Sequence, residues 1–242
     1  MTSYSALVEA KKNLLLGSYL YFISYFFGIV EKAQFIISKH HILVADTLND
    51  VLRGDIRRLI INIPPGYSKT EMAVIGFISY CMAKYPHSRF IHLSYSDSLA
   101  LLNSQKIRDI VLLDEFQELW PLQIKHDTRS KKRWNIAEYG GGVYATSTGG
   151  QITGFRAGRP GFDEFNGAII IDDPLKADDA HSDIERNNVN SRYNNTINSR
   201  TFDRNTPIIV IGQRLHEDDL CGFLLNGGSG EKWHHLNLPV MI

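Results

Sequence analysis

The residue types best suited to chemistry lie in one short loop, Pro64-Pro65-Gly66-Tyr67-Ser68-Lys69-Thr70. An apolar run precedes this loop and a helical pattern follows it, so the sequence predicts a strand, a tight turn and a helix. Backbone N–H groups of such a turn and of the helix N-terminus would face the β- and γ-phosphates of ATP. Lys69 would neutralise charge on the γ-phosphate, and the Thr70 hydroxyl would ligate Mg²⁺.

The loop departs from the usual phosphate-loop pattern, G-x-x-x-x-G-K-[ST]. Ile63 occupies the first glycine position and Ser68 the second, so only Gly66 remains to relax the turn. The alternative interpretation is a structural Pro-Pro-Gly turn with an exposed lysine. Its position between a predicted strand and a predicted helix favours the phosphate loop.

Two adjacent carboxylates end a second apolar run, residues 168–171. A P-loop ATPase needs one carboxylate to hold Mg²⁺ and often a second to orient the attacking water. We assign Asp172 to the metal and Asp173 to the water. Many such enzymes have Glu at the second place, and Asp173 is shorter. The alternative is a strand-end turn formed by Asp-Asp-Pro.

The wider pattern alternates apolar, strand-like runs with helix-like runs, which predicts an α/β fold with a mostly parallel sheet flanked by helices. We expect strands at 59–63, 90–94, 168–171 and 208–211, and helices at 70–83, 99–113, 179–199 and from about 217. The Gly-, Thr- and Ser-rich segment 140–158 predicts one or two hairpins.

Composition limits the classes of function. The 26 Lys and Arg residues balance 26 Asp and Glu residues, so any contact with nucleic acid must come from a local patch. Cys81 and Cys221 lie in apolar patterns without metal-type spacing, which predicts buried free thiols. The uncharged segment Leu14–Val30 is slightly short for a membrane span and contains Gly, Ser and Tyr, so we favour a buried amphipathic helix and expect no membrane partner.

Five segments resemble the successive ATPase motifs of phage terminase large subunits, in the same order and spacing over residues 40–240: RLIINIPPGYSKTE, SRFIHLSYSDSLA, GGQITGFRAG, AIIIDDPLKADDA and VIGQRLHEDDL. The resemblance implies an additional-strand P-loop ATPase core that binds ATP and Mg²⁺. It implies a ring of subunits that packages double-stranded DNA, with a portal protein and a small terminase subunit as partners, in the cytoplasm of a bacterial host.

The same resemblance suggests how the chain is divided. Residues 1–45 would be an N-terminal helical and aromatic segment, 46–225 the ATPase core, and 226–242 the start of a linker toward a nuclease domain. That nuclease is absent from the 242 residues, so we expect no DNA cleavage by this chain.

Site roles follow from the matching motifs. Residues 64–70 would be Walker A, and Asp172 with Asp173 Walker B. Gln213, in the motif that couples hydrolysis to motion, would sense the γ-phosphate, although a simple strand-end hydrogen bonder is an alternative. Arg156 would act as an arginine finger on an adjacent subunit. It could equally be a surface arginine, and nearby Arg159 could replace it.

Three weaker signals remain. Residues 216–219 (His-Glu-Asp-Asp) could form a metal cluster, but we favour a helix start in which acids suit the helix dipole. The basic run 129–134 could contact DNA phosphates or form a solvated loop. Gln34 with Phe35 could help seat the adenine. For the whole chain, the alternatives to a motor are a non-catalytic nucleotide- or portal-binding module and a helicase-like translocase.

Overall fold

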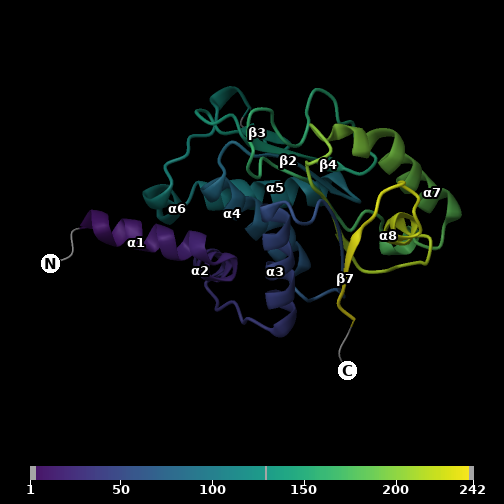
Figure 1. Cartoon of the computed structure of the whole chain (residues 1–242), viewed down its shortest axis with the longest axis horizontal. Helices are drawn as coiled ribbons and strands as arrows, with labels where there is room; N and C mark the ends of the chain where they lie inside the picture. The colour runs from purple at the N-terminus through teal and green to yellow at the C-terminus, as the bar shows by residue number, and fades with distance from the viewer. Residues whose placement is uncertain (1–3, 129, 240–242) are drawn as a thin grey trace.

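A seven-stranded sheet forms the centre of the molecule in the order β3-β4-β2-β5-β6-β1-β7 (Figure 1). The computed structural model describes residues 4–128 and 130–239. Only β3 runs antiparallel to its neighbour; every other pairing is parallel. The strands are β1 (Arg58–Asn62), β2 (Arg89–Ser94), β3 (Arg133–Asn135), β4 (Gly142–Ser147), β5 (Ile169–Asp172), β6 (Ile208–Gly212) and β7 (His234–Asn237). The predicted mixed α/β fold with a mostly parallel sheet is confirmed.

Helices cover both faces of the sheet, as parallel strands require. One face is covered by α1 (Tyr4–Gly17), α2 (Tyr19–Glu31), α3 (Lys39–Arg53), η1 (Glu71–Gly76), α4 (Phe77–Lys84), α5 (Asp97–Val111) and α6 (Asp114–Leu119). The other carries α7 (Asp183–Arg192), η4 (Tyr193–Ile197), η5 (Asn198–Arg200) and α8 (Leu220–Leu225). Two single turns, η2 (His126–Thr128) and η3 (Ala177–Asp179), complete the list.

Alternation along the strands builds the two halves of the core. In β1, Leu59 and Ile61 belong to the cluster under α2–α5, whereas Ile60 belongs to the cluster under η4 and α8. Successive strand residues point to opposite faces, and both faces are covered. The predicted apolar runs are therefore buried strands, within one or two residues of the expected bounds.

The aromatic N-terminal segment packs on the core. Leu15, Phe22 and Phe26 are buried together with residues of α4 and α6. No single described helix is long and apolar enough to cross a membrane. The pair α1 and α2 passes that test together by length and composition, but the chain bends by 113° between them.

Two expectations need correction or refinement. The segment 140–158, expected to form one or two hairpins, contributes one strand. This strand, β4, forms a hairpin with β3, which precedes the segment, and pairs in parallel with β2 on its other side; residues 148–158 return along the sheet without forming a strand. The proposed boundary at residue 45 falls inside α3, whose residues pack into the same core as α2. In the segment 226–242, assigned to a linker, residues 234–237 form the edge strand β7.

Candidate functional site

The predicted phosphate loop, residues 64–70, and the acidic pair Asp172–Asp173 meet at the carboxyl edge of neighbouring strands. The Thr70 hydroxyl donates to Asp172 Oδ2 over 2.7 Å, across 102 residues of sequence. Beside it, Lys69 Nζ lies 2.9 Å from Asp173 Oδ2. This contact follows from the topology, because β1 and β5 flank β6 and all three end at the same edge. The structure thus brings together four of the residues that the sequence singles out.

Two residues of the loop have the left-handed backbone conformation that glycine adopts without strain. Gly66 has φ +85°, and Ser68, at the second glycine position of the common pattern, has φ +56°. An L-residue in this left-handed region is strained by about 1–2 kcal/mol. The Met72 amide still donates to Ser68 O over 2.8 Å. Ser68 therefore keeps the turn that a glycine would form without strain.

We expect Ser68→Gly to stabilise the fold by about 1 kcal/mol, because it removes this strain, and to leave nucleotide binding intact. Denaturant unfolding of the variant checks this. Gly66→Ala is the matched opposite: nothing lies within 4 Å of an added Cβ, so any destabilisation reports φ +85° alone. Loss of stability in Ser68→Gly would contradict the assignment of strain to this position.

The helix after the loop begins irregularly. Its first turns form the wide helix η1, which continues as α4. The Tyr19 hydroxyl, from α2, donates to Met72 O and so takes up a carbonyl within the wide turn. A side chain inserted into the hydrogen-bond ladder is a common cause of such irregularity. Helix α2 therefore contacts the helix that carries the loop's C-terminal end.

Asp172 is the electrostatic centre of the site. It is 4% exposed. Burial first, and then the charge of Asp173, raises its pKa to about 7, against a partial opposing effect of Thr70 and Lys69. Asp172 Oδ1 is buried and has no hydrogen-bond partner among the residues that the structure describes. An orphaned carboxylate oxygen beside a threonine hydroxyl fits a hard cation that supplies the missing partner.

The number of protein ligands near Asp172 limits which cation the site could bind. In the described part of the chain, no group of three or more His, Cys, Asp and Glu side chains is placed to hold a metal ion. A cation at Asp172 and Thr70 would therefore need water or phosphate oxygens as further ligands. Mg²⁺ with a nucleotide is bound in this way, through few protein ligands.

The backbone conformation of Asp173 also fixes the position of its side chain. Asp173 has φ +44°, its N–H donates to Ile211 O, and its carbonyl accepts from the Tyr95 amide. A Cβ on Gly212 would lie 3.1 Å from Asp173 Oδ1, so the absence of a side chain at Gly212 leaves room for this carboxylate. Gln213 follows β6 directly and is partly buried, at the same sheet edge as the acidic pair.

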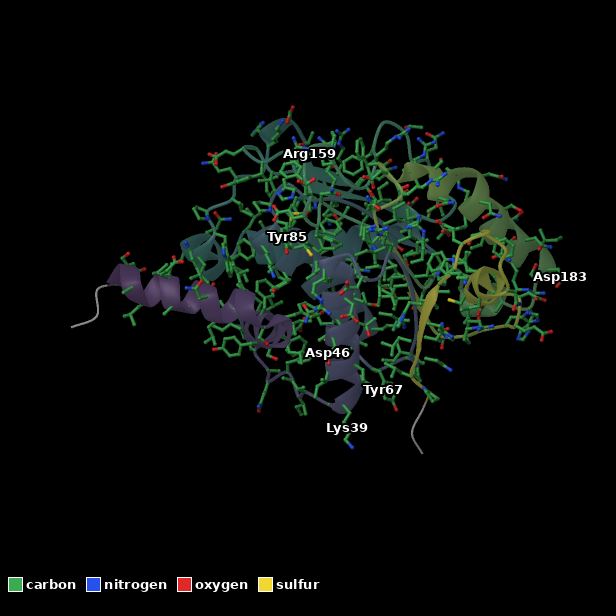
Figure 2. All side chains as sticks on the ribbon, in the orientation of Figure 1. Lys39, Asp46, Tyr67, Tyr85, Arg159 and Asp183 are labelled. Atoms are coloured by element: carbon green, nitrogen blue, oxygen red, sulfur yellow. The ribbon has the colours of Figure 1, made fainter. Side chains whose placement is uncertain are left out.

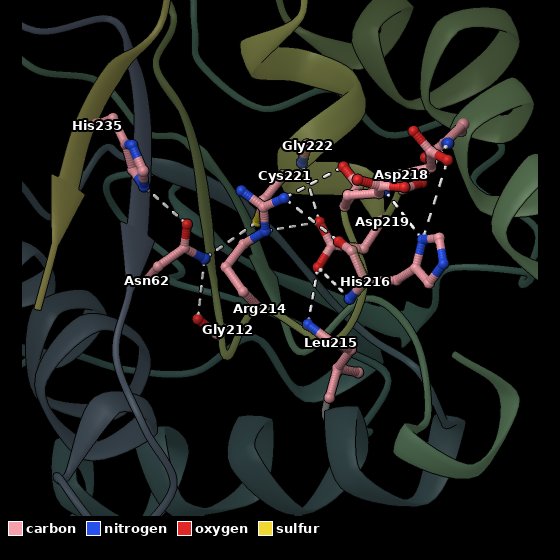
Figure 3. Close-up of polar contacts among 12 residues, drawn as sticks. Asn62, Gly212, Arg214, Leu215, His216, Asp218, Asp219, Cys221, Gly222 and His235 are labelled. Carbon is pink, nitrogen blue, oxygen red and sulfur yellow. Dashed lines mark hydrogen bonds and ion pairs between the residues drawn. The ribbon is translucent and has the colours of Figure 1, made fainter. Parts of the chain in front are cut away.

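Sequence reasoning missed Asn62, the last residue of β1 (Figure 3). Its amide nitrogen donates to Gly212 O at 3.1 Å and lies 3.4 Å from the Cys221 sulfur. Its oxygen lies 2.8 Å from His235 Nε2, on β7. Asn62 thus joins the start of the phosphate loop to β6, α8 and β7. Only its position before the loop could have indicated a role.

Residues 216–219 lead into helix α8, which begins at Leu220, so the favoured helix start lies one residue beyond them. Asp219 is the N-cap of α8, and its carboxylate accepts from the amides of Gly222, Leu215 and His216 (Figure 3). Arg214 pairs with the same carboxylate at 3.2 Å. Both thiols, Cys81 and Cys221, are buried and free, as predicted.

Arg156 lies away from its own phosphate loop. Ala157, the next residue, bridges to Thr201, and the Gly158 amide donates to Arg89 O at the first residue of β2. This is the strand-start edge, about 16 Å from the strand ends for a six-residue strand. Figure 2 shows Arg159, of the same loop, near the top of the view and Tyr67, of loop 64–70, near the bottom.

The two candidate arginines differ in environment. Arg156 is exposed. The Arg159 guanidinium donates to Tyr139 O and lies 5.5 Å from the centre of the Phe162 ring. Gln34 is exposed and Phe35 is buried in the core, so Phe35 presents no free ring for an adenine.

Comparison with known proteins adds evidence on the fold. No protein-family model and no curated protein matches the chain. Among solved structures, the crystal structure of the HK97 bacteriophage large terminase is similar, with a TM-score of 0.52 and 16% sequence identity. The fold is terminase-like. The match covers 86% of this chain but 40% of that one, so the chain spans well under half of the terminase it resembles.

Proposed function

We propose that this chain is an ATP-hydrolysing motor domain that drives double-stranded DNA into a viral procapsid. The observation that carries the proposal is the paired contact of Thr70 with Asp172 and of Lys69 with Asp173. Two segments that lie about 100 residues apart present a cation ligand set and a lysine at one sheet edge. The terminase-like fold supports the same function.

Each residue has a distinct task in this proposal. The amides of loop 64–70 and Lys69 bind the β- and γ-phosphates. Thr70 and Asp172 would hold Mg²⁺, which supplies charge neutralisation on the phosphates when bound. Lys69 must exchange Asp173 for phosphate when ATP binds, which frees Asp173 to orient the attacking water. Gln213, one residue beyond β6, would report the state of the γ-phosphate to the core.

Arg156 would complete the site of another subunit. Because it lies at the strand-start edge and the phosphate loop at the strand-end edge, contact between subunits must be head to tail. Heterologous contacts generate a closed ring when the rotation between subunits closes on itself. We therefore propose a homo-oligomeric ring in the cytoplasm of a bacterial host, with a portal protein and a small terminase subunit as partners.

The first test measures ATP turnover against protein concentration, with Lys69→Ala as the blank. We expect turnover to rise faster than linearly, because subunits complete one another's sites. Lys69→Ala should lower turnover at least about 100-fold, since it removes charge stabilisation at the transferred phosphoryl group. Turnover retained in Lys69→Ala would contradict the site assignment. Turnover that rises strictly linearly with protein concentration would contradict the proposed role of Arg156.

A binding module is the second candidate. The Lys69–Asp173 ion pair and the strained Ser68 favour it, because both raise the cost of binding ATP. A titration with ATP separates the two candidates. Micromolar binding without turnover at any protein concentration would select the binding module.

A further inference from the structure

Six cationic side chains lie along the outer strand β3 and around the start of the parallel strand β2. They come from four separate segments: Lys131, Lys132 and Arg133 at the beginning of β3, Arg89 at the start of β2, Arg159 in the loop between β4 and β5, and Arg200 at the end of η5. We call this group the basic edge. Its members are up to 111 residues apart in the sequence, so only the fold brings them together.

Aromatic rings hold two of these charges in place. Lys132 Nζ lies 5.8 Å from the centre of the Tyr144 ring, and the Arg133 guanidinium lies 5.6 Å from that of Phe155. The two rings stack on each other at 5.5 Å. Cation–π contacts orient a cation without cancelling its charge.

Carbonyl groups fix two more. Arg89 Nε donates to Gly140 O over 3.2 Å, and Arg159 donates to Tyr139 O. Burial lowers the pKa of Arg89, and the charges of Arg159 and Arg133 lower it further, as expected for cations crowded together. Within residues 4–128 and 130–239, no member of the basic edge forms an ion pair with a carboxylate.

A hollow of about 360 Å³ opens at the basic edge. Arg89, Arg156 and Arg200 line it, together with glycine, proline and phenylalanine, and no acidic side chain does. Arg200 Nε is buried and, within the described part of the chain, has no hydrogen-bond partner. Guanidinium groups around a hollow without carboxylates fit an anion with several acceptor oxygens, such as a phosphate.

We propose that the basic edge binds the phosphodiester backbone of duplex DNA. Four of these cations are held in place by rings or carbonyl groups, and a group of cations outside ion pairs suits phosphates, which fix position without reading sequence. A chain of zero net charge has no global field to attract DNA, so a local surface of this kind must supply the contact. The choice of DNA rests on the proposed function. Arg156, beside the basic edge, remains assigned to a neighbouring subunit's nucleotide.

The test measures binding of a short fluorescent DNA duplex across a range of salt concentrations. Lys131→Gln/Lys132→Gln removes two exposed charges, and Arg200→Gln removes one from the hollow. The control, Lys39→Gln/Lys232→Gln, removes two exposed charges elsewhere; Lys39 lies at the opposite end of the molecule from Arg159 (Figure 2). Unchanged melting temperatures identify the folded variants, and the exposed lysine pair keeps the test valid if Arg200→Gln unfolds.

We expect several-fold weaker binding at low salt and a salt slope smaller by about 1 for each charge removed, with the control unchanged. Equal losses in the control, unaltered binding in both variants, or no binding by the unaltered chain would overturn the proposal. A single-stranded oligonucleotide bound more tightly than the duplex would also overturn it. ATP turnover is measured in parallel. DNA binding that depends on the basic edge, in the absence of any ATP turnover, would contradict the proposed motor function and still support the proposed DNA-binding surface.

Discussion

Asp172→Asn is expected to abolish ATP turnover while making the nucleotide-free protein more stable. Turnover should fall by about 10²–10³, because the amide cannot balance the cation and phosphate charges. Stability should rise by about 1–3 kcal/mol at pH 8, since the variant no longer buries a carboxylate next to Asp173. Thermal unfolding and a steady-state ATPase assay measure the two effects on one preparation.

The stability gain should depend on pH in a defined direction. The pKa of Asp172 is raised from its model-compound value of 3.8 to about 7, so the folded state holds the proton more tightly than the unfolded chain. The wild type therefore loses stability as pH rises from about 4 to about 7, and Asn does not. The difference in the free energy of unfolding between wild type and Asp172→Asn should be near zero at pH 4, should grow up to about pH 7, and should be constant above it.

Bound nucleotide should reverse the order of stability of wild type and Asp172→Asn. Mg²⁺ with ADP should raise the melting temperature of the wild type and leave Asp172→Asn unchanged, because ligands stabilise only the state that binds them. Asp179→Asn is a suitable control, since this exposed carboxylate follows β5, which ends at Asp172, in the sequence but is not part of the candidate site. A variant that is less stable than wild type at pH 8 would mean that the carboxylate is paired, not strained.

Arg156→Ala is expected to lower turnover by about 10³ and to leave ATP affinity unchanged. An arginine finger acts on the charge of the transition state, which is absent when ATP simply binds. The measurement pairs turnover with an ATP titration, without DNA. Arg159→Ala is the control, because Arg159 is held by Tyr139 O within its own subunit and should retain turnover.

Mixing identifies whether the arginine acts between subunits. Arg156→Ala keeps an intact phosphate site, and Asp173→Ala keeps an intact arginine, so mixed rings contain some complete sites. We expect turnover to reappear on mixing two inactive proteins. Mixtures that stay inactive, although both variants assemble, would assign Arg156 to another role.

Local pattern alone predicted much of this fold. The runs that became β1, β2, β5 and β6 are continuous stretches of β-branched and other apolar residues, and such stretches are buried in any parallel sheet. The candidate loop 64–70 and Asp172–Asp173 were also singled out locally, because each is a short motif at a strand end, and the structure brings them into contact. Asp219 was recognised as part of a helix start for the same reason.

Long-range pairing decided the rest. Hairpins were expected within 140–158, but β4 pairs with β3, before that segment, on one side and with β2, about 50 residues earlier, on the other. Tertiary contacts likewise placed β7 and Asn62 beside the loop, and Arg156 at the far edge.

The amino-acid sequence alone indicated where the strands would form and which short motifs stand at their ends, because these depend on neighbours along the chain. Only the tertiary structure decided that Asp172 is buried, that one of its oxygens has no hydrogen-bond partner among the described residues, that its pKa is raised, and that six cations gather along β3 and around the start of β2. Burial and electrostatic fields are sums over residues distant in sequence, and no local pattern contains them.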